Sequence, residues 1–495
     1  MIEQYDVVVV GAGPVGMLTA IELTLAGVRV VVLERLAAPS TAMKAFTVGP
    51  LGCEALARRG MLDGLAAGEA QNLAEMQRFT EQTGADLAGR MKKYSGQFAG
   101  LALIRRDVMK EPERRGYAID QPGLEAVMAG RVRALGIEVR RAHEVTGFTQ
   151  GDDGVEVHGS CNGGVFRLRG AYLVACDGGR SLIRKQAGFA FPGTPPSLTF
   201  YQAIVELDHP ERLLPAGWHR TEGGVFAYGP FPGRLFILDF SGPPQDRDAP
   251  VTREEIETLV RRISGKDIRV ISMATASRWA DNTRLADSYR RGRVLLAGDA
   301  AHVHSPFGGQ GMNLGLVDAA NLGWKLAAVV RGDMPEHLLD SYTAERRPVA
   351  EVVLANTLAQ VAILRPDPQA GAMRDLFAHF MQFDNVNRYI GEMMTGLATR
   401  YDMQSPLDAV GRLLGDQHGL YALMQDGHGV LLDASADASA SRSVAAATER
   451  VRCVAVDGGV SMLIRPDACV AWAGEAGSTD GLIDALRRWF NPAAR

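Results

Sequence analysis

A glycine-rich turn between two valine-rich segments restricts the folds open to this 495-residue chain. The flanking segments, Tyr5–Val10 and Val28–Leu33, are short, β-branched and largely apolar, which is typical of buried parallel strands. Val15–Ala26 between them has helical periodicity, and Gly27 follows it as a residue suited to a helix C-terminus. The sequence therefore predicts a strand–helix–strand unit and, with it, an α/β fold.

The turn reads Gly11-x-Gly13-x-x-Gly16, and Glu34 follows the second strand. Gly11 permits a tight turn, Gly13 lets the backbone approach a pyrophosphate, and Gly16 lets the helix pack closely on the strand. The helix N-terminus faces the phosphates, and the carboxylate of Glu34 can bind ribose hydroxyls. We predict a dinucleotide site that consists of Gly11, Gly13, Pro14, Val15, Gly16, Glu34 and Arg35. This motif fits NAD and FAD equally well.

Charge and composition exclude several classes of protein. A net charge of −4 and the lack of a long Lys/Arg run give no electrostatic basis for binding nucleic acid or an anionic membrane. No segment approaches the roughly 18 apolar residues that a transmembrane helix requires. The five cysteines include no CxxC pair, which argues against a zinc site or a disulfide framework. We expect a cytoplasmic protein without a metal and, at this length, with two or three domains.

The sequence pattern changes near Phe191. From there, prolines and glycines separate short segments in which the side chains alternate as in β-strands. Thr199–Leu207, Gly224–Tyr228 and Arg234–Phe240 are the clearest of them. Alternate side chains of the last strand share one face, namely Arg234, Phe236, Leu238 and Phe240. This pattern predicts an antiparallel sheet with one face available to a ligand.

Two later segments place polar motifs directly after buried strands. "YLVACDGG" (172–179) carries Asp177-Gly178, and "RVLLAGDAAHVHSPFGGQGMN" (293–313) carries Gly298-Asp299. The second segment continues through a glycine-rich loop into a long helix. Free N–H groups and the positive dipole end at such a helix N-terminus stabilise negative charge on a ligand. We expect these donors at Gly311, Met312 and Asn313.

Two histidines of the same loop, His302 and His304, stand close to Asp299 in sequence and raise the question of a metal. No further ligand cluster at a suitable spacing accompanies them. We therefore expect a polar loop at this point and no metal.

With these three motifs the chain resembles the FAD-dependent aromatic hydroxylases, the single-component (class A) flavoprotein monooxygenases with the para-hydroxybenzoate hydroxylase fold. It looks most like the bacterial aromatic polyketide hydroxylases, which carry an extra thioredoxin-like C-terminal domain. The likeness covers nearly the whole chain. It implies that the first motif holds FAD, that Asp299 binds a ribityl hydroxyl, and that NADPH or NADH docks transiently without a dinucleotide fold of its own.

The resemblance also implies further FAD contacts. "YAIDQPGLE" (117–125) resembles the segment that carries the family's flavin-contacting glutamine, here Gln121, and the loop near Pro306, Gly309 and Gln310 is expected close to the flavin C4a atom. Where relatives present a Ser-Arg pair and then a second arginine, this chain has Met43-Lys44 and Leu51. Lys44 keeps the charge without the bidentate fork of arginine. Beyond the first motif, the expected FAD residues are Lys44, Gln121, Val145, Asp177, Gly178, Gly298, Asp299, Pro306, Gly309, Gly311, Met312 and Asn313.

These observations predict a protein of three parts. Residues 1–175 and 271–395 form the Rossmann-like FAD-binding domain, and residues 176–270 form a substrate-binding antiparallel sheet that residues 73–100 can join. Residues 396–495 form the thioredoxin-like domain without CxxC.

The implied activity is that of an NAD(P)H- and O₂-using monooxygenase that hydroxylates a phenolic polycyclic aromatic through a flavin C4a-hydroperoxide. The expected substrate residues are Tyr201, Trp218, His219, Phe226, Tyr228, Phe236 and Phe240. No catalytic base is identified, because an acidic phenol would need none. A Baeyer–Villiger oxygenase or an epoxidase on the same fold is an alternative, and a flavin-binding scaffold that does not catalyse is a third. A flavin halogenase is disfavoured because the tryptophans include no W-x-W pair. We expect a monomer or a homodimer.

Overall fold

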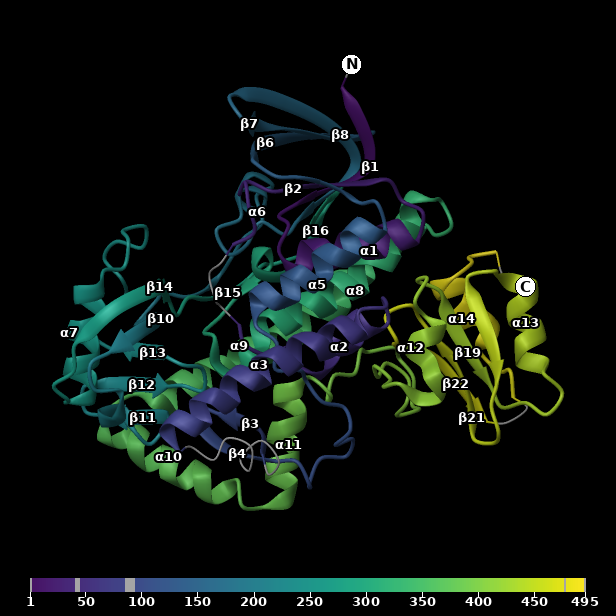
Figure 1. The fold of residues 1–495 in the computed structure, drawn as a ribbon. Coiled ribbons are helices and arrows are strands. Elements are labelled where there is room, and N and C mark those ends of the chain that lie inside the picture. The colour runs from purple at the N-terminus through teal and green to yellow at the C-terminus, as the bar shows by residue number, and fades with distance from the viewer. Residues whose placement is uncertain (1, 41–44, 85–93, 476–477, 494–495) are drawn as a thin grey trace.

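The computed structural model describes residues 2–40, 45–84, 94–475 and 478–493. Its largest sheet has the order β16-β17-β8-β1-β2-β5, with β1, β2, β5, β8 and β17 parallel and the hairpin β6–β7 attached to β8 (Figure 1). These strands are β1 Glu3–Val10, β2 Val30–Leu33, β5 Glu138–Arg140, β6 His143–Gly151, β7 Gly154–Cys161, β8 Gly164–Ala175, β16 Arg290–Arg291 and β17 Val294–Leu296. The α/β class predicted from the glycine-rich turn is confirmed.

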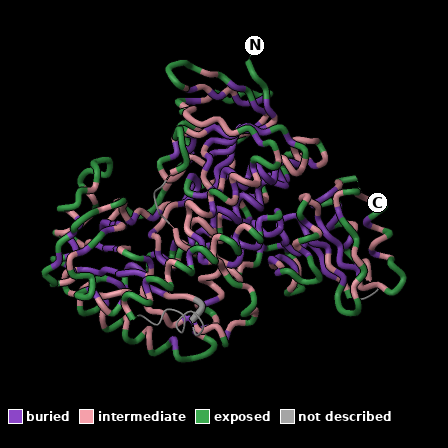
Figure 2. The backbone as a smooth tube through the Cα atoms, in the orientation of Figure 1, coloured by how far each residue is buried: buried purple, intermediate pink, exposed green. Residues whose placement is uncertain are grey.

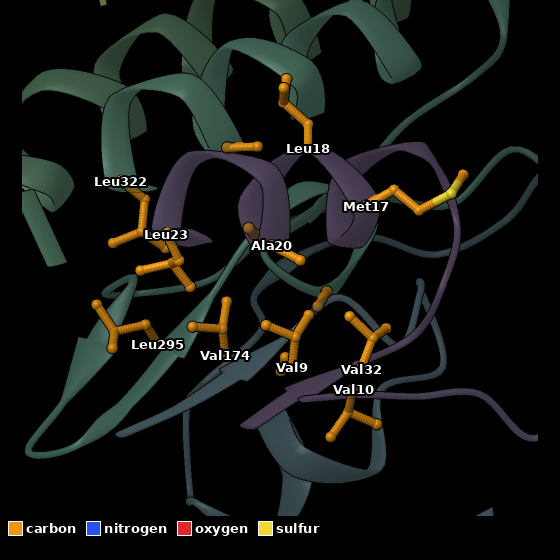
Figure 3. Close-up of a cluster of buried hydrophobic side chains, with 14 of the residues drawn as sticks. Val9, Val10, Met17, Leu18, Ala20, Leu23, Val32, Val174, Leu295 and Leu322 are labelled. Atoms are coloured by element: carbon orange, nitrogen blue, oxygen red, sulfur yellow. The ribbon is translucent and has the colours of Figure 1, made fainter. Parts of the chain in front are cut away.

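Helix α1 (Pro14–Leu25) packs on this sheet against α5 and α8. Figure 3 shows the contact: Leu23 of α1 points toward the strands that carry Val9 and Val32, whereas Leu18 points to the opposite side of the helix, and all four side chains are fully buried. Burying each such side chain stabilises the fold by about 1.5–3 kcal/mol. The remaining helices of this part are α2 Pro50–Ala57, α5 Gln121–Ala134, α6 Leu182–Gln186, α8 Gln310–Val330 and α9 Asp340–Leu364.

A second, antiparallel sheet has the order β11-β12-β13-β10-β14 and lies at the far side of the molecule from the C-terminus (Figure 1). Its strands are β10 Thr199–Leu207, β11 Gly217–Thr221, β12 Gly224–Tyr228, β13 Arg234–Asp239 and β14 Val270–Ala280, and helix α7 (Arg253–Ser264) covers one face. The pairing of β14 with β10 extends the sheet to Ala280, beyond the expected boundary at residue 270.

Further helices, short strands and 3₁₀ turns lie outside these two sheets. They are α3 Leu62–Thr83, β3 Tyr94–Phe98, β4 Leu101–Arg105, β9 Gly193–Thr194, β15 Thr283–Leu285, β18 His302–Val303, α10 Pro368–Phe380 and α11 Asp384–Thr395, with short 3₁₀ turns at Pro210–Leu213, Gly298–Ala300, Phe307–Gly309, Glu336–Leu339 and Gln417–Gly419. Among the described residues, Glu336–Leu364 is the one helical stretch long and apolar enough to cross a membrane. Half of its most apolar window is buried inside the protein, as in a core helix of a folded domain.

The C-terminal domain contains the four-stranded sheet β20-β19-β21-β22, in which β19 and β20 are parallel. Its elements are α12 Leu420–Leu423, β19 Gly429–Asp433, α13 Ser439–Ala447, β20 Val451–Ala455, β21 Val460–Ile464, β22 Val470–Glu475 and α14 Leu482–Trp489. The alanine- and serine-rich stretch 433–443 is expected to be a surface loop, but α13 begins inside it. The buried carboxylate of Asp433 accepts from the N–H groups of Ser435 (2.9 Å) and Ser441 (2.8 Å), which fixes the chain at this point.

Buried charges join the C-terminal domain to α8 and α9. Arg465 donates from Nη1 and Nη2 to the carboxylate of Glu345, each at 2.8 Å, and Lys325 donates to the same carboxylate at 2.8 Å. Asp467 is the second carboxylate on Arg465, and the guanidinium also lies 4.4 Å from the ring centroid of Trp489. The buried colouring in Figure 2 continues from the central helices into the C-terminal strands. The C-terminal domain is therefore packed firmly against the rest of the protein.

Candidate functional site

A cavity of about 1660 Å³ lies between the two sheets. Its lining includes the N-terminal turns of α1 and α8, the inner face of the second sheet, and residues of α3, β4 and α11. The carboxyl ends of β1, β8 and β17 all point to this region, which is where ligands bind in open parallel sheets. The site therefore collects residues from segments that are far apart in sequence.

The glycine-rich turn has the backbone that a pyrophosphate site needs. Gly11 has a φ of +105°, and a Cβ there would lie 2.3 Å from the carbonyl oxygen of Cys176. A Cβ on Gly16 would lie 1.9 Å from the carbonyl oxygen of Gly11, so both positions exclude any side chain. Gly13, by contrast, has nothing within 4 Å of its Cβ position and caps α1 without a side-chain hydrogen bond. Open space and free helix amides thus coincide at Gly13, as phosphate binding requires.

Glu34 lies beside this turn. Its carboxylate accepts from the N–H of Ala12 (2.8 Å) and the N–H of Leu36 (2.9 Å). These bonds hold the carboxylate at the end of β2, next to the phosphate turn and outside the lining of the large cavity. That position is compatible with the ribose of an adenosine at the remote end of a dinucleotide.

The two aspartates that follow β8 and β17 differ in their surroundings. Asp177 accepts from the N–H of Leu182 (2.8 Å) through Oδ2, while its Oδ1 is buried without a hydrogen-bond partner, and burial raises the pKa of its carboxyl. Asp299 is exposed and lines the cavity. A free carboxylate at this point can accept from ligand hydroxyl groups.

The N-terminus of α8 is held open by a single side chain. Gly309 caps the helix in the left-handed conformation (φ +63°) and offers no side-chain cap. Asn313 donates to the carbonyl of Gly309 (2.8 Å) and accepts from the N–H of Gly49 (2.7 Å), which ties the loop to the start of α2. The first-turn amides consequently face the cavity, where they can stabilise negative charge on a bound group.

The predicted cofactor residues fall into two groups. Those that line the cavity are Gly13, Pro14, Val15, Gly16, Gln121, Gly178, Asp299, Pro306, Gly309, Gln310, Gly311, Met312 and Asn313. Those placed outside the lining are Gly11, Glu34, Arg35, Val145, Asp177 and Gly298. Val145 lies on β6 in the outer hairpin, opposite Gly159. Lys44 lies outside the described residues.

The histidines of the loop have separate roles. His302 is fully buried, and its Nε2 lies 2.7 Å from Asp318, which also pairs with Arg346 (2.7 Å). His304 lines the cavity and donates from Nδ1 to the carbonyl of Ser305 (2.8 Å), so its Nε2 is the basic nitrogen. Among the described residues, no group of three or more His, Cys, Asp or Glu side chains is arranged to hold a metal.

Burial lowers the pKa of His304 to about 4. Because the unfolded chain takes up this proton near pH 6.5 and the folded protein does not, His304 stabilises the fold fully above pH 6.5 and less as the pH falls toward 4. Lowering the pH from 7 to 5 should reduce the free energy of unfolding of both proteins. We expect this reduction to be about 2 kcal/mol smaller in His304→Gln than in the parent. Urea unfolding at both pH values measures this difference. Equal losses in the two proteins would show that His304 is protonated in the folded state.

The inner face of the second sheet contributes an aromatic wall. Trp218 and Phe236 line the cavity and meet edge to face, with ring centroids 5.5 Å apart. Phe307, next to the glycine-rich loop, lies 6.0 Å from Trp218 by centroid. Two of the seven predicted substrate residues, Trp218 and Phe236, therefore line the cavity.

The other five candidates do not reach the cavity. Tyr201, His219, Phe226 and Tyr228 point to the opposite face, toward the cluster made with α7. Tyr201 donates to Glu255 of α7 (2.9 Å), and burial raises its pKa to about 12. Phe240 lies just beyond the end of β13 and packs in the cluster under the wall without lining the cavity. For the first four the reason is the period of two in a strand: each is one position away from a residue of the inner face and therefore points to the opposite side of the sheet.

Several residues of the inner face carry no sequence prediction. Gln202 pairs with Phe236 across β10 and β13, Ser277 pairs with Gln202 across β14, and Arg234 is two positions before Phe236. All three line the cavity. The alternation along β13 places Arg234 and Phe236 on one face, so the sequence pattern could have identified Arg234 as a residue of the site. The partners on β10 and β14 depend on strand register, which the sequence did not give.

The glycine-rich turn, the open helix N-terminus and the aromatic wall around one cavity are the arrangement expected of a dinucleotide-dependent oxidoreductase with an aromatic substrate. Residues 4–357 match the FAD binding domain family, and residues 409–493 match the aromatic-ring hydroxylase C-terminal family. The chain belongs to the FAD-dependent aromatic hydroxylases and is an FAD-dependent monooxygenase. The family, the fold class and the cofactor predicted from the sequence are confirmed.

Known relatives span the whole chain. The 12-dehydrotetracycline 5-monooxygenase/anhydrotetracycline 6-monooxygenase of Streptomyces rimosus is 38% identical, with 99% of this chain and 100% of the relative aligned. The structure of OxyS anhydrotetracycline hydroxylase from Streptomyces rimosus superposes with a TM-score of 0.85 at 36% identity, covering 99% of both chains. The dialkyldecalin synthase of Streptomyces rugosporus is 34% identical over 99% of both chains, so the same architecture also serves a protein that is not named as an oxygenase.

Proposed function

We propose that the enzyme hydroxylates a polycyclic phenol, with NADPH or NADH as electron donor and O₂ as the source of the oxygen atom. The observation that carries this proposal is the aromatic wall beside the glycine-rich loop: Trp218, Phe236 and Phe307 present ring surfaces to one cavity. Aromatic rings stack on such surfaces in offset or edge-to-face geometry. Relatives whose names specify tetracyclic substrates support the same substrate class.

The volume of the cavity agrees with two occupants. Pockets for one small molecule measure roughly 300–1,000 Å³, and this one measures about 1660 Å³. FAD fits the residues on the cofactor side, because Gly13 leaves open space, the α1 and α8 amides are free, and Asp299 offers a carboxylate. When bound, the flavin supplies electron transfer and oxygen activation.

Residues of the chain itself would orient the flavin and the substrate and exclude water from the site. The amides at Gly311 and Met312 would face the end of the flavin where negative charge accumulates. The wall of Trp218, Phe236 and Phe307 would hold the substrate ring and exclude water on that side. We expect the nicotinamide cofactor to dock transiently, since the sequence has no second GxGxxG turn.

Anaerobic mixing of the FAD-loaded enzyme with NADPH tests this function. We expect polycyclic phenols to speed the loss of flavin absorbance at least tenfold, and subsequent ¹⁸O₂ addition to give a product with one labelled oxygen. Absence of flavin reduction with every phenol would contradict the proposal and favour a non-redox role. A labelled oxygen inserted next to a carbonyl group, as in a lactone, would instead support a Baeyer–Villiger oxygenase. A labelled epoxide would support an epoxidase.

We further propose a cytoplasmic enzyme that works as a monomer or a homodimer. The net charge of −4 gives no attraction to an anionic membrane. Size-exclusion chromatography with light scattering measures the assembly state, and a larger assembly would contradict this part of the proposal.

A further inference from the structure

Among the described residues, Arg234 of the cavity lining combines two features: it forms no salt bridge, and its Nε is buried without a hydrogen-bond partner. Arg234 begins β13, two positions before Phe236, so both side chains face the cavity. The guanidinium lies 3.9 Å from the ring centroid of Phe46, which in turn stacks on Phe231 (5.2 Å between centroids). Aromatic rings thus fix the arginine in place from one side.

The hydrogen bonds of Arg234 leave much of the guanidinium unused. Its Nη1 donates to the carbonyl of Gly229 (2.9 Å), while its Nε is buried without a partner. No carboxylate of the described residues forms a salt bridge with it, whereas Arg114 and Arg278 in the same cavity lining pair with Glu54 and Glu255, each at 2.7 Å. Burial lowers the pKa of Arg234 to about 10, so the group remains protonated at neutral pH.

Arg234 as a whole is half-buried, but a buried N–H donor without a partner, on a charged group, costs free energy that a bound acceptor would recover. The other acidic side chains of the lining that could pair with Arg234 are already engaged, Glu69 with Arg115 and Glu111 with Arg114, while Asp299 lies on the cofactor side after β17. Among the described residues of the lining, none of these carboxylates is thus available to Arg234, which leaves a bound molecule as the source of an anion.

We propose that Arg234 binds the ionised phenol or enol oxygen of the aromatic substrate, so that the substrate reacts as its anion without a protein base. This inference rests on the proposed function. Side chains two positions apart on one strand are roughly 6.6 Å apart, which is comparable to the width of fused rings. A ring system lying on Phe236 would consequently bring an oxygen at its edge to Arg234.

The proton released by the phenol passes to solvent, so no general base is needed. An opposite charge at this distance lowers the pKa of an acid by about 1–3 units. The resulting oxyanion donates electron density into the ring, which makes the ring carbon a better nucleophile toward an electrophilic oxygen. Arg234 would act as a specificity determinant as well, because an aromatic molecule without an acidic oxygen leaves the charge unpaired.

A spectrophotometric titration of a bound phenol tests this role without turnover. The probe is alizarin, a three-ring phenol whose absorbance changes on ionisation, bound to the oxidised FAD-loaded enzyme in the absence of NADPH. We expect the apparent pKa of bound alizarin to lie at least one unit below that of free alizarin. Arg234→Met should abolish this shift and weaken binding at pH 8 by about 10- to 100-fold, and Arg234→Lys should keep part of the shift. Phe236→Leu is the matched control, which should weaken binding and retain the shift.

Four outcomes would overturn the inference. A shift that persists in Arg234→Met would assign the anion site to another residue. At least tenfold weaker FAD binding in Arg234→Met, with the probe unaffected, would make the cofactor the partner of the charge. A bound probe with no pKa shift in the parent enzyme would exclude an anion site for phenols, and so would failure of the parent to bind alizarin at all. A shifted pKa in an enzyme that nevertheless produces no oxygenated product would contradict the proposed function alone.

Discussion

Replacing Glu345 by alanine is expected to lower the free energy of unfolding by about 3–5 kcal/mol, which is the cost of leaving a buried charge without its partner. The Glu345 carboxylate is buried and accepts from two nitrogens of Arg465, from Lys325 and from Asn321 (2.6 Å). Asp467 remains to compensate Arg465, but Lys325 is left without a carboxylate within salt-bridge distance. The C-terminal domain should then separate from α8 and α9 before the rest of the protein unfolds.

Urea unfolding of the FAD-loaded protein followed by circular dichroism measures the loss, and limited proteolysis reports separation of the C-terminal domain. Glu351→Ala is the matched control, because Glu351 lies on the same helix and pairs with Arg347 (2.7 Å) at the surface. We expect this exposed pair to contribute about 0.3–0.5 kcal/mol. Equal destabilisation by the two substitutions would mean that the buried charges do not hold the domains together.

The network should also persist in mild acid. The Arg465 and Lys325 charges hold the pKa of Glu345 well below its usual range despite burial, which acts in the opposite direction. The stability due to Glu345 is therefore fully present above the pKa of an unfolded glutamate and is lost only as the pH falls toward the lowered value. The firm attachment of the C-terminal domain follows from paired charges in a buried place, together with the packing of Trp324 against Trp489.

Gly13→Ala is expected to weaken FAD binding at least tenfold, about 1.4 kcal/mol or more, while the FAD-free protein keeps its stability. A methyl group at this position meets no protein atom within 4 Å and needs no unusual backbone conformation, since φ is −74°. It would instead occupy the space above the α1 N-terminus into which the pyrophosphate must come. Fluorescence titration of the apoprotein with FAD measures the affinity.

Gly130→Ala provides the control for this substitution. Gly130 lies within α5, and its Cβ position is also free of neighbours within 4 Å. Alanine there should leave FAD affinity unchanged and stabilise the helix by about 0.5–1 kcal/mol. Unchanged FAD affinity in Gly13→Ala would show that the phosphates lie elsewhere, and the assignment of the turn would then be wrong.

Local sequence patterns were sufficient for much of the cofactor side. The spacing of Gly11, Gly13 and Gly16 allows few backbone paths, because Gly11 has a positive φ, Gly16 packs on the backbone of Gly11, and Gly13 leaves the space before the helix open. The loop before α8 is similar: the left-handed conformation of Gly309 favours glycine, and the open helix N-terminus follows from it. Such signals can be recognised in a sequence because they depend largely on the conformation of a short segment of backbone.

The substrate side was decided by tertiary structure. Alternation along β13 correctly grouped Arg234 with Phe236, but only the packing of α7 on the other face determined which face was left for the cavity. Tyr201 and Phe226 were candidates as aromatic residues, yet the register of β10 and β12 turned them to α7. In the same way, the sequence shows where the arginines are, but only the folded chain shows which of them lie close enough to a carboxylate to form a salt bridge. The sequence by itself determined the phosphate turn and the class of cofactor, because those depend largely on local backbone geometry. The substrate face and its unpaired charge depend on contacts between distant segments, so only the tertiary structure could decide them.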